Sequence, residues 1–111
     1  MIRRVIVADD DPERRNLVSL LVKACIPDVR VTKMIDGRDV VERVRHANGN
    51  GYDLVILDNQ MGGMPGVEVV RSIRTFNQKI PIVIYYKTDH PEEALDYGAT
   101  VHMQRPTKRE V

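Results

Sequence analysis

The chain has few cysteines, few aromatic residues and no long hydrophobic run. One cysteine, no tryptophan and one phenylalanine occur among its 111 residues. A single cysteine excludes an internal disulfide, which is consistent with a reducing compartment. No apolar segment reaches the ~18 residues that a membrane-spanning helix needs, and no signal-peptide pattern begins the chain, so the sequence predicts a cytoplasmic protein.

The sequence also lacks a strong excess of either charge. Its 17 Lys and Arg residues balance 16 Asp and Glu residues, for a formal net charge of +1. This balance favours neither nucleic acid nor an anionic membrane as a direct partner. The length and the 42% share of hydrophobic residues suit one globular domain, which we expect to span residues 1–111.

The most informative stretch is residues 54–58, with the sequence Leu-Val-Ile-Leu-Asp. A short, continuous apolar run bounded by turn residues is typical of a strand buried on both faces of a parallel sheet. The glycine-containing segment 59–66 follows, and then an amphipathic helical pattern. Asp58 is therefore expected at the carboxyl end of a central strand, where open α/β sheets bind their ligands.

Strand and helix patterns alternate along the rest of the chain. Asp11 and Pro12 are suited to begin the first helix, whose apolar spacing extends to Cys25 and predicts that this cysteine packs in the core. Further helical patterns follow the second, third and fourth strands, the last over residues 91–97. The predicted strands are residues 3–8, 29–34, 54–58, 80–86 and 101–104. Such alternation predicts a parallel sheet with helices on both faces.

The hydrophobic patterns also order the strands. The first, third and fourth strands are continuously apolar and should be central, whereas the second and fifth alternate and should lie at the edges. The order 2-1-3-4-5 satisfies both conditions and gives a doubly wound, five-stranded, flavodoxin-like α/β fold. Its switch point lies between the first and third strands, so Asp9 and Asp10 should meet Asp58 in one crevice.

Three neighbouring carboxylates repel one another unless a proton or a cation compensates them. A hard ion such as Mg²⁺ suits carboxylate and carbonyl oxygens and keeps several of its waters. Such an ion could hold a phosphoryl donor against Asp58, whose carboxylate could act as a nucleophile and form an aspartyl-phosphate. Alternatively, the residues at 9–11 only cap the following helix, although Asp11 alone suffices for that role.

These residues resemble the receiver domain of bacterial response regulators, over nearly the whole chain up to Pro106. In that family, an acidic pair after the first strand and an aspartate after the third strand bind Mg²⁺. The resemblance implies that Asp58 accepts a phosphoryl group from a sensor histidine kinase or a phosphotransfer protein. The metal ligands that it implies are Asp9, Asp10, Asp58 and the backbone carbonyl of Gln60.

Several positions depart from the family pattern. Tyr86 stands where the family usually has a Thr or Ser hydroxyl that meets the phosphoryl group, and Lys87 follows where a small residue is usual. Arg105 replaces the usual lysine before a proline; it keeps the positive charge, but its planar fork is not equivalent to an ammonium group. His102 matches an aromatic switch position, so a Tyr86–His102 pair would be a different switch or no switch.

The sequence ends before a fifth helix. Right-handed crossovers place the first helix on one face and the next three on the other, and a fifth helix would join the first. Residues 107–111 are too few to form it, so apolar surface on the fourth and fifth strands should be left uncovered. We therefore expect either a longer protein, possessing an effector domain, or a second copy that covers this face.

Two other classes of function stay open. A degenerate receiver would act as an interaction module without phosphorylation. Asp9 and Asp11 after a strand also resemble the nucleophile motif of haloacid-dehalogenase-type phosphatases, but that family needs further acidic and lysine motifs and a longer chain. We therefore expect a signalling module rather than an enzyme.

Overall fold

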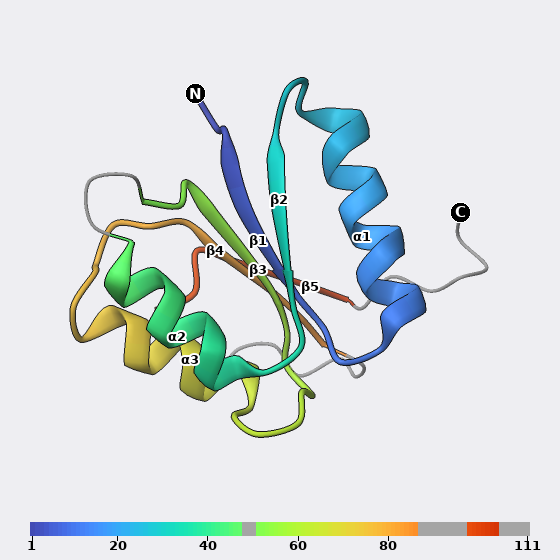
Figure 1. The fold of residues 1–111 in the computed structure, drawn as a ribbon. Coiled ribbons are helices and arrows are strands. Elements are labelled where there is room, and N and C mark those ends of the chain that lie inside the picture. The colour runs from blue at the N-terminus through green and yellow to red at the C-terminus, as the bar shows by residue number, and fades with distance from the viewer. Residues whose placement is uncertain (48–50, 87–97, 105–111) are drawn as a thin grey trace.

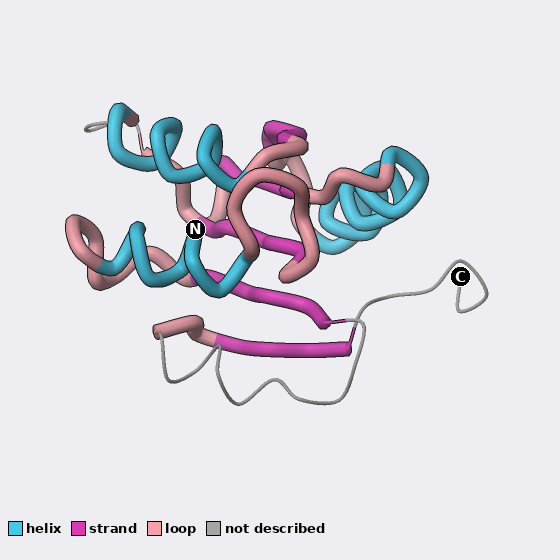
Figure 2. Tube along the Cα trace, turned by 90° about the horizontal axis from the view of Figure 1, so that it is seen from below, coloured by secondary structure: helices cyan, strands magenta, loops and turns pink. Residues whose placement is uncertain are grey.

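The computed structural model describes residues 1–47, 51–86 and 98–104. A central sheet lies between α1 on one face and the α2–α3 pair on the other (Figures 1 and 2). The elements are β1 (Arg4–Ala8), α1 (Pro12–Cys25), β2 (Arg30–Met34), α2 (Gly37–His46), β3 (Leu54–Asp58), α3 (Gly66–Arg74), β4 (Ile82–Tyr86) and β5 (Val101–Gln104). Within the described ranges, none of the helices is long and apolar enough to cross a membrane.

The strands lie in the order β2-β1-β3-β4-β5, and every neighbouring pair is parallel. The predicted doubly wound, flavodoxin-like sheet is confirmed for its first four strands, in the order 2-1-3-4. The short β5 lies beside β4, where Val101 is the register partner of Val83. The helix predicted over residues 91–97 and the predicted lack of a fifth helix fall outside the described residues.

Burial along the strands follows their hydrophobic patterns. Residues 5–8 of β1 are fully buried, because helices and neighbouring strands surround them on every side. The side chains of β2 are exposed or only partly buried, as its predicted edge position requires. A continuous apolar run therefore marks a central strand here, and an alternating run marks an edge strand.

The start of α1 is fixed by two residues directly after β1. Asp11 caps the helix by accepting a hydrogen bond from the backbone N–H of Glu13 at 3.0 Å, and Pro12 occupies the first turn. The buried strip of the helix consists of Val18, Ser19 and Val22. Cys25 is exposed, so the prediction that it packs in the core is wrong; the buried strip is narrower than the apolar spacing suggested.

The helices α2 and α3 cover the other face of the sheet and also pack against each other. Their buried side chains are Val40, Val41, Val44, Val69, Val70 and Ile73. Gly37 permits the close approach, because a Cβ at this position would collide with the carbonyl oxygen of Met64 and the side chain of Val69. This layer forms the larger apolar cluster and supports β3 from the side opposite to α1.

Asp53 ties the amino end of β3 to the start of β1. Its Oδ2 accepts hydrogen bonds from the backbone N–H groups of Arg3 and Arg4, at 2.8 and 3.0 Å. The hydrogen bond from Arg3, and then that from Arg4, hold the pKa of Asp53 below its ordinary value of 3.8. Because the folded-state pKa is lowered, the stabilisation is fully present above that ordinary value and is lost as the pH falls through the folded-state pKa.

We therefore expect Asp53→Asn to lower the free energy of unfolding by about 1 kcal/mol at neutral pH. The difference from the wild-type protein should shrink as the pH falls below the ordinary aspartate value, where the carboxyl group loses its charge in both states. Urea denaturation from pH 7 to pH 3 measures this difference. A difference that stays constant over that range would contradict the role assigned to the carboxylate charge.

Candidate metal centre

Three carboxylates meet at the carboxyl ends of two adjacent strands. Asp9 and Asp10 directly follow β1, and Asp58 is the last residue of β3. One oxygen from each lies within 4.8 Å of the others. The structure thus brings together the three side chains that the sequence predicted to share one crevice. Asp9 and Asp58 are fully buried, whereas Asp10 is exposed.

Asp9 is held by hydrogen bonds to both of its carboxylate oxygens. Its Oδ1 accepts from the backbone N–H of Asp11 at 2.9 Å and from Nη2 of Arg14 at 3.2 Å. Its Oδ2 accepts from Nε of Arg14 at 2.7 Å and from the hydroxyl of Tyr85 at 2.5 Å. These four contacts fix the orientation of a buried charge, which would otherwise be costly.

Arg14 is a cation inside the acidic cluster. Its guanidinium contacts Asp9, reaches Oδ2 of Asp58 at 3.4 Å and reaches Oδ2 of Asp11 at 3.3 Å. Burial alone would lower its pKa, but the hydrogen bond and charge of Asp9, with the charges of Asp58 and Asp11, raise the pKa above its ordinary value. Arg14 therefore stays charged and compensates part of the repulsion among the carboxylates. No pattern in the sequence singled out this residue as part of the site.

Tyr85 is a second site residue that no sequence pattern indicated. It is the register partner of Asp58 across β3 and β4, so both side chains lie on the α1 face of the sheet. Burial, followed by the hydrogen bond to Asp9 and its charge, raises the pKa of Tyr85 above its ordinary value of 10. The phenol is therefore neutral and donates its proton to the hydrogen bond with Asp9.

Tyr86 lies on the other face of the same strand. Its ring is buried in the apolar cluster beneath α2 and α3, with 6% of the residue exposed. The alternation of side chains along a strand explains the difference, because neighbours in β4 point to opposite faces. The hydroxyl contact to the acidic cluster comes from Tyr85 in this structure, and the role of Tyr86 stays a prediction.

The turn after Asp58 is held close to the carboxyl end of β3 and the start of α3. The backbone N–H of Gln60 donates to Oδ1 of Asp58 at 3.4 Å, and the N–H of Gly62 donates to Oδ2 of Asp10 at 3.2 Å. Gly66 lies so close to the turn that a Cβ there would be 2.8 Å from the carbonyl oxygen of Asp58. The backbone of Gln60 thus lies near the carboxylates. Arg105 and the side chain of His102 fall outside the described residues.

The donor set suits a hard divalent cation. Mg²⁺ binds oxygen ligands at 2.0–2.1 Å, so the ligands of one ion lie roughly 3–4 Å apart. The separations among the three carboxylates come close to this range, and the exposed Asp10 gives the cluster access to solvent. Residues 9, 10 and 58 therefore fit a magnesium ion that retains several waters, provided that the guanidinium of Arg14 makes room.

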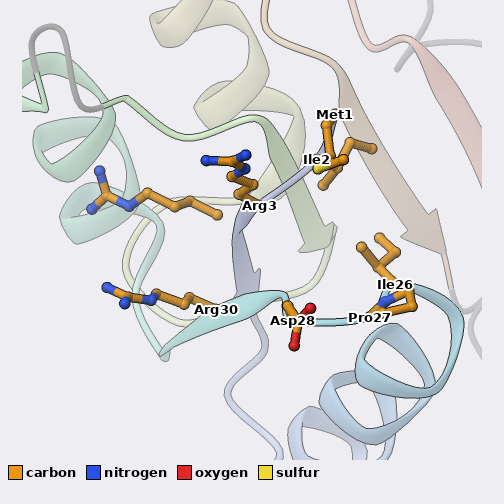
Figure 3. Close-up of a pocket in the computed structure, with 8 residues that line it drawn as sticks. Met1, Ile2, Arg3, Ile26, Pro27, Asp28 and Arg30 are labelled. Carbon is orange, nitrogen blue, oxygen red and sulfur yellow. The ribbon is translucent and has the colours of Figure 1, made fainter.

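A separate hollow lies at the amino end of the sheet. It has a volume of about 720 Å³ and is lined by Met1, Ile2, Arg3, Arg4, Ile26, Pro27, Asp28 and Arg30. The labelled arginine side chains extend away from Ile26 and Pro27 (Figure 3). The hollow contains none of the three clustered carboxylates, so its basic and apolar lining belongs to a different part of the molecule.

Comparison with known proteins agrees with this geometry. The chain is 32% identical over 105 residues to the transcriptional regulatory protein ZraR of Klebsiella oxytoca. This match covers 92% of this chain and 23% of that protein. It is 34% identical over 109 residues to a protein-glutamate methylesterase/protein-glutamine glutaminase of a Nocardioides species, covering 93% of this chain and 29% of that protein. The chain thus spans about a quarter of the length of these curated relatives.

A solved structure and a family model give the same assignment. The Vibrio cholerae chemotaxis protein CheY4 superposes with a TM-score of 0.81 and 26% identity, over 99% of this chain and 92% of that one. Residues 5–111 match the model of the response regulator receiver domain. This match covers more than half of the chain, and the chain therefore belongs to the response regulator receiver domain family.

Proposed function

We propose that this receiver domain accepts a phosphoryl group on Asp58 in two-component signal transduction. The observation that carries the proposal is the convergence of Asp9, Asp10 and Asp58 at the carboxyl ends of β1 and β3. These carboxylates, with the backbone carbonyl of Gln60, would hold Mg²⁺. When bound, the ion would offset the negative charge that accumulates between the carboxylates and the phosphoryl oxygens.

The reaction follows from the placement of Asp58. One carboxylate oxygen attacks the phosphorus of a phosphohistidine, a new P–O bond forms and the P–N bond breaks. The electron pair of the P–N bond leaves on the imidazole, which takes up a proton. The donor would be a sensor histidine kinase or a phosphotransfer protein, as the family membership suggests. The receiver would act as a signalling module of the cytoplasm rather than as an enzyme.

Three further residues complete the proposal. Arg105 would neutralise the phosphoryl oxygens, and its fork could donate two hydrogen bonds to them. Tyr86 and His102 would form a modified switch pair on β4 and β5. An effector domain or a second copy of this chain would then read the changed surface near β4 and β5, where Val101 and Met103 are each 49% exposed.

Acetyl phosphate with Mg²⁺ tests the phosphoacceptor directly. Intact-mass measurement should show one added phosphoryl group on the wild-type protein and none on Asp58→Asn. Asp53→Asn is the matched control, because it makes the same substitution at the opposite end of β3 and should be labelled like the wild type. If the wild-type protein takes up no phosphate from acetyl phosphate or from a phosphorylated kinase, the domain works as an interaction module and the proposal fails.

A further inference from the structure

Arg14 uses the same oxygen atoms that a divalent cation would need. Its Nε and Nη2 atoms donate to both carboxylate oxygens of Asp9, at 2.7 and 3.2 Å. The same Nη2 reaches Oδ2 of Asp58 at 3.4 Å. One guanidinium thus bridges the end of β1 to the end of β3, which is the bridge that a bound cation would make.

The two oxygens of Asp9 are already engaged. Besides Arg14, the backbone N–H of Asp11 and the hydroxyl of Tyr85 donate to them, so each oxygen accepts two hydrogen bonds. A carboxylate offers about four lone-pair positions. A metal ion, or a water bound to it, can therefore reach Asp9 on this side only when one of the donors leaves.

Arg14 is the donor best placed to leave. Its side chain is 16% exposed and extends from the first turn of α1, whereas Tyr85 is buried and the N–H of Asp11 is part of the backbone. A guanidinium that moves into water recovers its hydration, and the arriving cation takes over the compensation of the carboxylates. The carboxylates thus face a cation both before and after the exchange.

We propose that Arg14 is a built-in counter-ion that competes with Mg²⁺ for the acidic cluster, so that it lowers the affinity for the metal and stabilises the metal-free domain. The inference rests on the proposed metal site at Asp9, Asp10 and Asp58. It predicts a site that is weak for its ligand set and that opens by movement of one side chain.

Removing the guanidinium should therefore tighten metal binding. Arg14→Gln is expected to lower the dissociation constant for Mg²⁺ about tenfold, as expected for the loss of a competing charge-assisted contact. Arg14→Lys keeps the charge but not the two hydrogen bonds to Asp9. Its dissociation constant for Mg²⁺ should lie between those of the wild type and Arg14→Gln. Titration with magnesium chloride, followed by ¹H–¹⁵N NMR, measures the three constants, and circular dichroism verifies that each variant is folded.

Arg15→Gln is the matched control. Arg15 is the neighbouring residue and carries the same charge, but its Nη1 donates to the backbone carbonyl oxygen of Asp9 rather than to a carboxylate. This variant should change the Mg²⁺ dissociation constant less than threefold, because it alters only the general field around the site. A tightening equal to that of Arg14→Gln would overturn the proposal, since it would make the effect one of net charge.

The position of Arg14 gives an independent measurement. In the wild-type protein, the Nε–H signal of Arg14 should be protected from solvent exchange without Mg²⁺ and should lose that protection when Mg²⁺ binds. If Mg²⁺ binds while this signal keeps its protection, or if Arg14→Gln binds no more tightly than the wild type, the inference fails and the metal site stands. If Mg²⁺ changes the NMR spectra of neither the wild type nor Arg14→Gln, both the inference and the proposed metal site fail.

Discussion

Replacing Leu57 by alanine is expected to lower the free energy of unfolding by about 2–5 kcal/mol. Leu57 is fully buried in the cluster beneath α2 and α3, and it immediately precedes Asp58. Single domains are stable by only about 5–15 kcal/mol, so the loss is a large part of the total. Urea denaturation monitored by circular dichroism measures it.

Ile56→Ala is the matched comparison within the same strand. Ile56 points to the α1 face, where it is only partly buried. Its truncation should therefore cost clearly less than that of Leu57. Equal losses for the two variants would contradict the division of the core into a tightly packed α2–α3 side and a more open α1 side.

Replacing Asp58 by asparagine should have the opposite effect on the metal-free protein. The change keeps the shape of the side chain but removes one of three carboxylate charges, two buried and one exposed, whose oxygens lie within 4.8 Å of one another. Relief of this repulsion outweighs the loss of the long contact to Arg14, so we expect the free energy of unfolding to rise by about 1–2 kcal/mol.

The response to Mg²⁺ should then distinguish the two proteins. At ten times its dissociation constant, the ion should stabilise the wild type by about 1.4 kcal/mol, because it binds only the folded state. Asp58→Asn should gain much less. Thermal denaturation with and without magnesium chloride measures both effects, and Asp53→Asn should keep the full Mg²⁺ response. If Asp58→Asn is less stable than the wild type without metal, repulsion among the carboxylates does not destabilise the metal-free protein.

Much of the fold was predictable because each strand carries a clear pattern. The apolar run before Asp58 and the alternation around Thr32 distinguish a central strand from an edge strand. Helix α1 was predicted to begin at Pro12, because Asp11 and Pro12 are a cap and a first-turn residue. The meeting of the carboxylates then followed from the order of the strands, since adjacent parallel strands end at the same edge.

The missed residues depend on side-chain direction rather than on residue type. Tyr85 and Tyr86 are neighbours of the same residue type. Only the register with β3 shows that Tyr85 shares a face with Asp58. Arg14 was one of many arginines in the sequence. Its position three residues after the capping Asp11 was the available signal, because that spacing returns a helical side chain to the end of β1.

A crystal structure of the domain with Mg²⁺ and beryllium fluoride tests the central claim most directly. We predict one magnesium ion held by Asp9, Asp10, Asp58 and the carbonyl oxygen of Gln60, with direct oxygen ligands at about 2.1 Å. The fluoride adduct should lie on the carboxylate of Asp58, and the guanidinium of Arg14 should be displaced from Asp9 and Asp58. An adduct on another residue, or a structure in which Asp58 contacts neither the ion nor the fluoride group, would contradict the account.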